Sequence, residues 1–377
     1  MNNSLALKRR DSNLELYRCI VMVLIIAHHY VANSGLMDMI YANPMAGTSV
    51  FLTLFAAWGK PGINCFLLIT GYFMCKTDIS LKKYVKLLLE IYFYRTVLYI
   101  VFLITGYEPF SIKTLAKAVL LFKDLGSNFI GCYMLFFLLI PFLNILLRNL
   151  SQRMHLLLVM LCLFIYTGVG ALGGLPYFTI KINYISWFSV LYILAAYIRF
   201  YPNRIMEKTS LWCWVTAGVM VLSAVSIVVC AWLGDRLDYP KLIYYAVSDS
   251  NKPLALALGV ASFLMFKNIK VPYSPVINAF GASAFGALLL HANGDTMRRW
   301  LWVDLLKNTQ MYHSALLPVH AIVSVLVIYL VCSMIDMLRI RFFEKPFFRW
   351  WDKQYPRFFA WYEQKQAAIL QKLHIQK

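Results

Sequence analysis

The stretch NLELYRCIVMVLIIAHHY at residues 13–30 is apolar over a length that suits a membrane crossing, yet it carries ionisable side chains near both ends. In an α-helix, eleven steps of 100° exceed three turns by only about 20°, so Arg18 and His29 project from one face, about 16 Å apart along the axis. Glu15 lies within about 40° of the same face. Ionisable side chains in a membrane are costly and usually face a cavity or a bundle interior. The stretch therefore predicts a membrane helix with a functional face.

The composition extends this interpretation to the whole chain. Hydrophobic residues make up 61% of the 377 positions and charged residues only 14%, whereas globular domains average roughly 25% charged residues. We therefore predict an all-α, polytopic membrane bundle embedded in a lipid bilayer. Apolar windows of roughly 20 residues give about ten spans, which lie near residues 14–33, 50–75, 87–105, 129–147, 155–172, 184–200, 211–233, 253–267, 276–293 and 315–337.

The net charge of +19 is explained by topology better than by nucleic-acid binding. With an inner N-terminus, Lys and Arg divide roughly two to one in favour of the inner segments, as expected when positive charge collects in cytoplasmic loops. This asymmetry predicts that both termini are cytoplasmic and that nucleic acid is not a partner. The eighth and ninth spans are short and are bracketed by prolines, and Gly281 and Gly286 interrupt the ninth.

Two segments are predicted to lie on the membrane surface rather than across it. SIKTLAKAVLLFK at residues 111–123 places Lys113 and Lys117 one turn apart beside an apolar face, which is typical of an interfacial helix. Bases and aromatics alternate over residues 339–366, as in a cytoplasmic membrane anchor. We accordingly divide the chain into a membrane domain at residues 1–345 and an amphipathic, basic and aromatic tail at residues 346–377.

Histidines occupy the adjacent positions 28 and 29, and only one of them is expected to be the functional residue. Neighbouring helix positions point 100° apart, so we do not expect His28 and His29 to face the same centre or to form a metal site. The helical phase relative to Arg18 favours His29, and His28 stays a second candidate. The eight cysteines show no CxxC spacing, so no metal site is predicted from them either.

The scarcity of intramembrane acids bears on the class of protein. Glu15, Glu90 and Asp336 are the acids in or at the edge of a span, and all three lie near predicted cytoplasmic ends. A carboxylate relay through the membrane, common in ion-coupled transporters, is therefore not expected. A transporter or flippase of a lipid-linked saccharide remains the alternative to an enzyme, and a structural scaffold is a third possibility.

Several motifs together resemble the integral-membrane acyltransferase 3 family, especially its bacterial branch that O-acetylates surface polysaccharides. These motifs are N-x-E-L-Y-R-x(10)-H at residues 13–29, PGINCFLLITGYF at 61–73, CYMLFFLLIPFLN at 132–144, FGALLLH at 285–291 and RIRFFEKP at 339–346. The resemblance implies transfer of an acetyl group from cytoplasmic acetyl-CoA to a carbohydrate hydroxyl at the bacterial inner membrane. It places Arg18 and His29 at the Arg and His positions of the family.

The chemistry of these residue types agrees with that implied activity. A sugar hydroxyl becomes a good nucleophile when a base removes its proton, and histidine suits this task near neutral pH. Alternatively, His29 accepts the acyl group itself and passes it on. Arg18 suits the donor's phosphates or thioester carbonyl, because its planar fork matches oxyanions. The remaining candidates are Lys82, Lys83 and Lys86 for steering acetyl-CoA, with simple positive-inside topology as their alternative role, and Glu15, Asn64, Tyr72, His291 and Arg298 for binding the acceptor.

Overall fold

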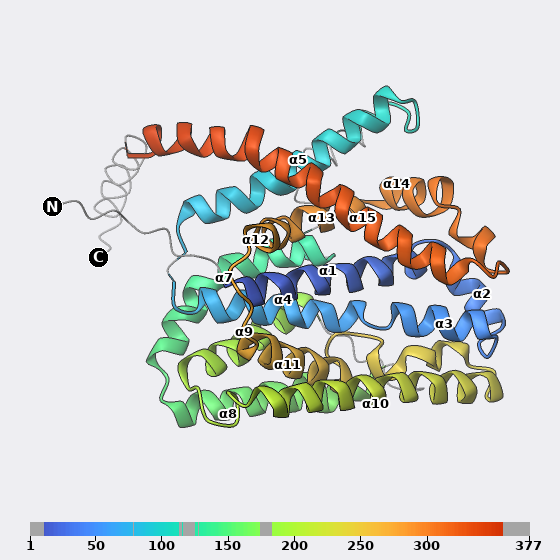
Figure 1. Cartoon of the computed structure of the whole chain (residues 1–377). Helices are drawn as coiled ribbons and strands as arrows, with labels where there is room; N and C mark the ends of the chain where they lie inside the picture. The colour runs from blue at the N-terminus through green and yellow to red at the C-terminus, as the bar shows by residue number, and fades with distance from the viewer. Residues whose placement is uncertain are drawn as a thin grey trace.

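The computed structural model describes residues 11–77, 79–112, 115, 125, 126, 128–173 and 183–356, and within these ranges it is helical with no strand. The predicted all-α class is thereby confirmed. Most of the long helices run side by side along one axis (Figure 1). In the first half they are α1 (Ser12–Ala32), α2 (Leu36–Ala42), α3 (Gly47–Ala56), α4 (Gly59–Met74), α5 (Leu81–Ile104), α7 (Phe129–Asn149), α8 (Gln152–Leu163), η2 (Phe164–Gly168) and η3 (Val169–Leu172).

The second half continues the same bundle. Its helices are α9 (Tyr184–Phe200), α10 (Thr209–Arg236), η4 (Pro240–Val247), α11 (Pro253–Asn268), α12 (Pro275–Ala282), α13 (Ala284–His291), α14 (Asp295–Arg298), η5 (Arg299–Leu305), η6 (Asn308–Met311), α15 (Leu317–Arg339) and η7 (Ile340–Glu344). Several of them begin with a proline. The proline ring fixes φ near the helical value, and the missing backbone N–H would have no partner in the first turn of a helix. Others begin where a side chain caps the first turn, as Asn128 does for α7.

Each of the ten predicted spans coincides with helix in the described residues. Seven segments are long and apolar enough to cross a membrane, and α9 and α11 are shorter apolar helices. The ninth span differs from the prediction because it is two short helices, α12 and α13, that meet at Ser283. The chain is thus a multi-pass membrane protein. The predicted surface helix at residues 111–123 lies mostly outside the described residues.

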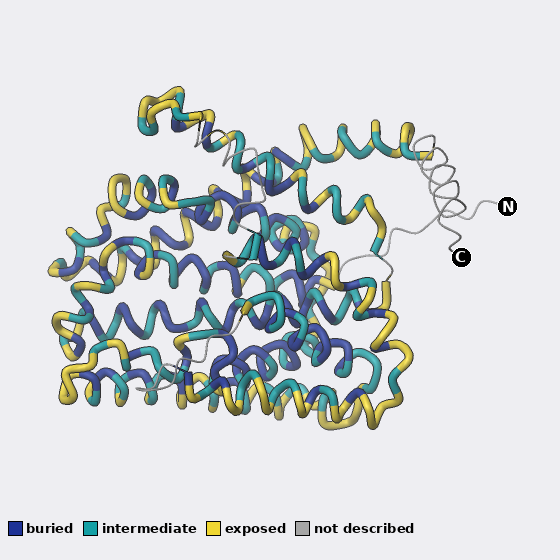
Figure 2. The backbone as a smooth tube through the Cα atoms, turned by 180° about the vertical axis from the view of Figure 1, so that it is seen from behind, coloured by how far each residue is buried: buried dark blue, intermediate teal, exposed yellow. Residues whose placement is uncertain are grey.

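Burial separates an inner set of helices from an outer set. The most apolar window of α1 is 61% buried, whereas that of α10 is 17% buried. Exposed side chains on α10 such as Trp214, Val221 and Leu222 are themselves large and apolar, as expected of a surface that faces lipid tails. Figure 2 shows buried positions along the central helices and exposed positions along the outermost ones. Polar side chains on α1 therefore face protein or an internal cavity.

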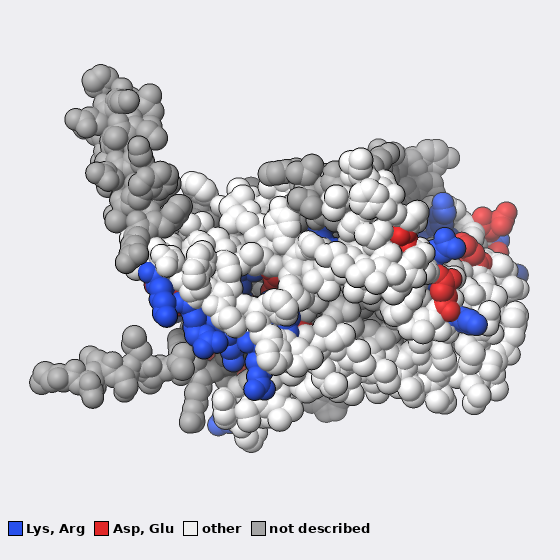
Figure 3. All heavy atoms as spheres, turned by 90° about the horizontal axis from the view of Figure 1, so that it is seen from above, with Lys and Arg blue, Asp and Glu red and all other residues white. Residues whose placement is uncertain are grey.

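Both ends of the described chain lie at the same end of the bundle (Figure 1), as an even number of crossings requires. Here helix continues from α15 through η7 to Pro356, without a break at the predicted boundary between residues 345 and 346. Exposed bases on this extension recur every four residues, at Arg341, Lys345, Arg349 and Lys353, so they share one face. Figure 3 shows a row of bases at this end, which we call the basic end, and a mixture of acids and bases at the other.

Candidate active site

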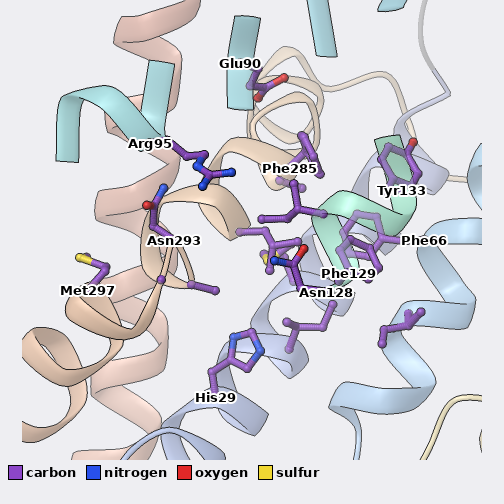
Figure 4. Close-up of a pocket in the computed structure, with 18 of the residues that line it drawn as sticks. His29, Phe66, Glu90, Arg95, Asn128, Phe129, Tyr133, Phe285, Asn293 and Met297 are labelled. Carbon is purple, nitrogen blue, oxygen red and sulfur yellow. The ribbon is translucent and has the colours of Figure 1, made fainter. Parts of the chain in front are cut away.

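A cavity of about 1000 Å³ lies among α1, α4, α5, α7, α12 and α13. Its wall includes Arg18, Lys83 and Lys86 towards the basic end, and His29 and Arg298 towards the opposite end. Aromatic and aliphatic side chains, including Phe66 and Phe285, line the space between (Figure 4). One cavity therefore contacts both Arg18 and His29, which the helical phase of α1 places on one face.

His29 is held by a second histidine from the broken ninth span. The Nδ1 of His29 lies 2.9 Å from the Nε2 of His291, and the Nδ1 of His291 lies 2.6 Å from the carbonyl oxygen of Ala287. A carbonyl oxygen only accepts, so Nδ1 of neutral His291 carries the hydrogen and its Nε2 accepts one. His29 consequently donates through Nδ1. Its Nε2 keeps the lone pair, which is the state that a general base requires.

His291 is fully buried and does not line the cavity. Its predicted role as an acceptor-binding residue is therefore corrected to a positioning role, in which it sets the tautomer and orientation of His29. The break between α12 and α13 brings this side chain to α1. A sequence pattern does not show this contact, because 262 residues separate the two histidines.

His28 also lines the cavity, although we expected only one of the two histidines to reach the site. The Nδ1 of His28 lies 3.0 Å from the carbonyl oxygen of Ala56, so this imidazole too is fixed in one tautomer. A Cβ atom at Gly59 would overlap the side chain of His28, which explains a glycine at the start of α4. The cavity is wide enough for residues 100° apart on α1 to contribute to its wall.

At the basic end, Arg18 forms an ion pair with Glu15, with 2.7 Å between Nη1 and Oε1. Arg18 lines the cavity, whereas Glu15 is buried behind it and does not. Gly281 of α12 leaves room for Glu15, because a Cβ atom there would overlap the carboxylate. The acceptor-binding role predicted for Glu15 is thus corrected to holding Arg18 in place.

The three candidate lysines divide into two groups. Lys83 and Lys86 line the cavity. Lys82 does not, and its Nζ lies 2.5 Å from Asp352 of the helical extension. Lys82, which we predicted to steer the donor, thus forms an exposed ion pair, whereas Lys83 and Lys86 lie on the cavity wall.

Asn64 and Tyr72, which we predicted to bind the acceptor, are not among the residues that line the cavity. Asn64 is fully buried and donates to the carbonyl oxygens of Ser250 and Ala255, at 2.7 and 3.0 Å. The Tyr72 oxygen accepts from Arg199 at 2.6 Å, and the guanidinium lies 4.3 Å from the ring centroid. Both side chains join helices to one another. The remaining acceptor candidate, Arg298, does line the cavity.

Arg95, Asn128 and Asn293 are among the polar residues of the cavity wall that were missed in the sequence. Figure 4 shows Arg95 of α5 beside Asn293, with Asn128 between them and His29. Arg95 carries the same signal that identified Arg18, a charge within an apolar span, and could have been found by it. Asn128 and Asn293 lie at helix ends far apart in sequence, so no local pattern marks them.

A buried ion cluster fixes the cavity wall to the last span. Arg339 is 5% exposed and pairs with Asp336, Glu344 and Glu90 at 2.7, 2.9 and 3.0 Å. Glu90 also lines the cavity. The RIRFFEKP segment thus contributes Arg339 and Glu344 to a cluster that ties α5 to α15 and η7 beside the basic end of the cavity.

The geometry describes a class of protein: a membrane-embedded helical bundle with a histidine and an arginine on the wall of one cavity. Comparison with protein-family models matches residues 11–337 to the acyltransferase 3 family, described as an acyltransferase domain. The match covers most of the chain, which therefore belongs to this family and is a membrane acyltransferase. Searches of curated proteins and of solved structures give no match.

Proposed function

We propose that this protein transfers an acetyl group from cytoplasmic acetyl-CoA to a hydroxyl of a cell-surface polysaccharide, or of its lipid-linked precursor, at the inner membrane of a bacterium. The observation that carries the proposal is the continuous cavity with cations at the basic end and an oriented imidazole beyond them. Membership of the acyltransferase 3 family supports acyl transfer as the reaction. The polarity of the cavity supports an anionic donor at one end and a hydroxyl acceptor at the other.

His29 acts as the general base in this mechanism. Its Nε2 takes the proton of the acceptor hydroxyl as the acceptor oxygen forms a bond to the thioester carbonyl carbon. The imidazolium that forms is stabilised because Nδ1 already donates to His291. When the carbon–sulfur bond breaks, His29 returns the proton to the departing thiolate. The proton, the new C–O bond and the broken C–S bond are thereby balanced.

Arg18 binds the anionic part of the acetyl-CoA donor in this mechanism. Its guanidinium is oriented by Glu15 and suits a phosphate of the donor. Helix geometry puts it about 16 Å from His29 along α1. A donor arm lying in the cavity would reach His29 while its anionic head remained with Arg18, Lys83 and Lys86.

The proposal is tested by mass spectrometry of surface glycans from a deletion strain complemented with the wild type, His29→Ala or His313→Ala. His313 is exposed and outside the cavity, so its variant is the matched control. We expect the acetyl mass difference to appear with the wild type and the control and to vanish with His29→Ala. Normal acetylation with His29→Ala, or saccharide movement across the membrane without acetylation, would contradict the proposal; the latter would favour a flippase.

A further inference from the structure

Lys60 is the one charged residue of the apolar segment at residues 50–75, and it lies on the cavity wall. It follows Gly59 at the start of α4, and a Cβ atom at Gly59 would lie 2.2 Å from the Cβ atom of His28. Lys60 thus lies beside the two histidines of α1 rather than at the basic end. A cation within a membrane span is costly and usually marks a functional site. Lys60 takes no part in the mechanism proposed above.

Lys60 forms a polar cluster with Tyr184 at the start of α9 and Asp249 in the segment before α11. The Nζ of Lys60 donates to the Tyr184 hydroxyl at 2.8 Å and lies 3.6 Å from Oδ1 of Asp249. The Tyr184 hydroxyl donates to the same carboxylate at 3.4 Å. Tyr184 lines the cavity together with Lys60, whereas Asp249 does not. The carboxylate therefore orients an ammonium and a hydroxyl that lie on the cavity wall.

Asn64 joins the three segments that carry this cluster, and α4 packs against both α9 and α11 (Figure 1). One turn after Lys60, Asn64 donates to the carbonyl oxygen of Ser250, the neighbour of Asp249, at 2.7 Å. The side-chain oxygen of Asn64 accepts from the indole of Trp187 on α9 at 3.0 Å. The cluster is thus held in a fixed geometry by buried hydrogen bonds, as a binding site requires.

The cluster keeps hydrogen-bonding capacity for a ligand. An ammonium has three donors, and the contacts of Lys60 with Tyr184 and Asp249 engage two of them. A hydroxyl oxygen has two lone pairs, and Tyr184 uses one of them to accept from Lys60. One donor and one acceptor therefore remain side by side on the wall. A sugar hydroxyl both donates and accepts, so it matches this pair.

We infer that Lys60 and Tyr184 bind a hydroxyl of the acceptor saccharide other than the one that is acylated, with Asp249 as a positioning residue. This inference rests on the proposed function. The bound hydroxyl fixes the sugar on the side of the cavity that carries His29, so that another hydroxyl reaches Nε2 of this imidazole. The cluster therefore determines which hydroxyl receives the acyl group.

The test uses the purified full-length protein in lipid discs, radiolabelled acetyl-CoA and, as acceptor, the glycans and glycolipids extracted from a deletion strain. Lys60→Met removes the donor but keeps a side chain of similar length. We expect it to raise the KM for the extract by about tenfold to hundredfold, because a hydrogen bond from a charged group is lost, with the KM for acetyl-CoA unchanged. The matched control is Lys241→Met, which changes an exposed residue of η4 outside the cavity.

The outcomes separate the inference from the proposed function. An unchanged KM for the extract in Lys60→Met, or a raised KM for acetyl-CoA alone, would overturn the inference while the proposed function stands. Absence of labelled saccharide with the wild type would overturn the proposed function and the inference with it.

Asp249→Asn distinguishes binding from a purely structural role. Asp249→Asn and Lys60→Met both break the ion pair, but only Lys60→Met removes a group from the cavity wall. We expect the KM for the extract to rise at least about fivefold more in Lys60→Met than in Asp249→Asn. Equal effects would mean that Lys60 only ties α4 to the segment of Asp249 and would contradict the inference.

Tyr184→Phe tests the site even where Lys60→Met does not fold. It keeps the ring that stacks on Phe188 and removes only the hydroxyl. We expect the KM for the extract to rise about threefold to tenfold, as the loss of one hydrogen bond predicts, and the acetyl group to spread over more than one hydroxyl of the product, as mapped by NMR. Acetylation at the single wild-type position with an unchanged KM for the extract would overturn the inference.

Discussion

The two ends of the cavity hold their functional side chains in different ways. At the basic end, Arg18 pairs with Glu15, and Lys86 pairs with Glu344. At the opposite end, the imidazoles of His28 and His29 are held through neutral contacts that end on backbone carbonyls. Ion pairs orient the cations at the basic end, whereas the neutral contacts leave each imidazole with a free lone pair. Under the proposed function, donor binding and proton transfer would therefore occur at opposite ends of the cavity.

The largest effect should come from removing the base. His29→Ala is expected to lower the rate of acetyl transfer by about 10²- to 10⁴-fold, the usual contribution of a positioned acid or base. His28→Ala should lower the rate less, because Nδ1 of His28 contacts a backbone carbonyl rather than a second imidazole. Steady-state kinetics on the purified protein in lipid discs measure both. A greater loss in His28→Ala would move the role of the base to that residue.

A smaller loss should follow from breaking the histidine pair. His291→Leu removes the acceptor for Nδ1 of His29 and is expected to lower kcat by about 10- to 100-fold, as loss of a partner that orients a functional histidine often does. His291→Gln should recover part of this loss, since an amide both donates and accepts. The KM for acetyl-CoA should stay constant in both. Failure of glutamine to exceed leucine would argue that His291 only fills space.

At the basic end, the effect should fall on binding rather than on chemistry. Arg18→Gln is expected to raise the KM for acetyl-CoA by about tenfold or more, because a charge-assisted contact to an oxyanion is lost. Arg18→Lys should lie between it and the wild type, since lysine keeps the charge but not the fork. Titrations of initial rate against acetyl-CoA provide the measurement. A fall in kcat at constant KM would instead place Arg18 in the chemical step.

Stability offers a milder test of how the cavity wall is held. A Cβ atom at Gly286 would overlap the carboxylate of Asp336, whereas one at Gly218 on α10 would meet nothing within 4 Å. Gly286→Ala should therefore lower the free energy of unfolding by about 1–3 kcal/mol through overpacking. Gly218→Ala should be neutral or stabilising by up to about 1 kcal/mol. Thermal unfolding in detergent compares them, and equal melting temperatures would show that α13 and α15 are not tightly packed.

The smallest effect is expected at Lys82. Its ion pair with Asp352 is exposed, and such pairs contribute about 0–1 kcal/mol. Lys82→Ala should leave the KM for acetyl-CoA within about twofold of the wild type, whereas a double Lys83→Ala, Lys86→Ala variant should raise it. The same titrations distinguish the two. A larger effect of Lys82→Ala would return this residue to the donor site.

The sequence by itself determined the helical class, the ten apolar segments and the shared face of Arg18 and His29, because span length and the 100° helical step are local properties. A charge within an apolar span is also a local property, and it identifies Arg95. Only the tertiary structure decided which polar side chains reach the cavity. Asn64 and Tyr72 bond to neighbouring helices instead, and His291 reaches His29 only because the ninth span breaks at Ser283 and α13 packs beside α1. Contacts between residues hundreds of positions apart depend on how helices pack, and no local period encodes them.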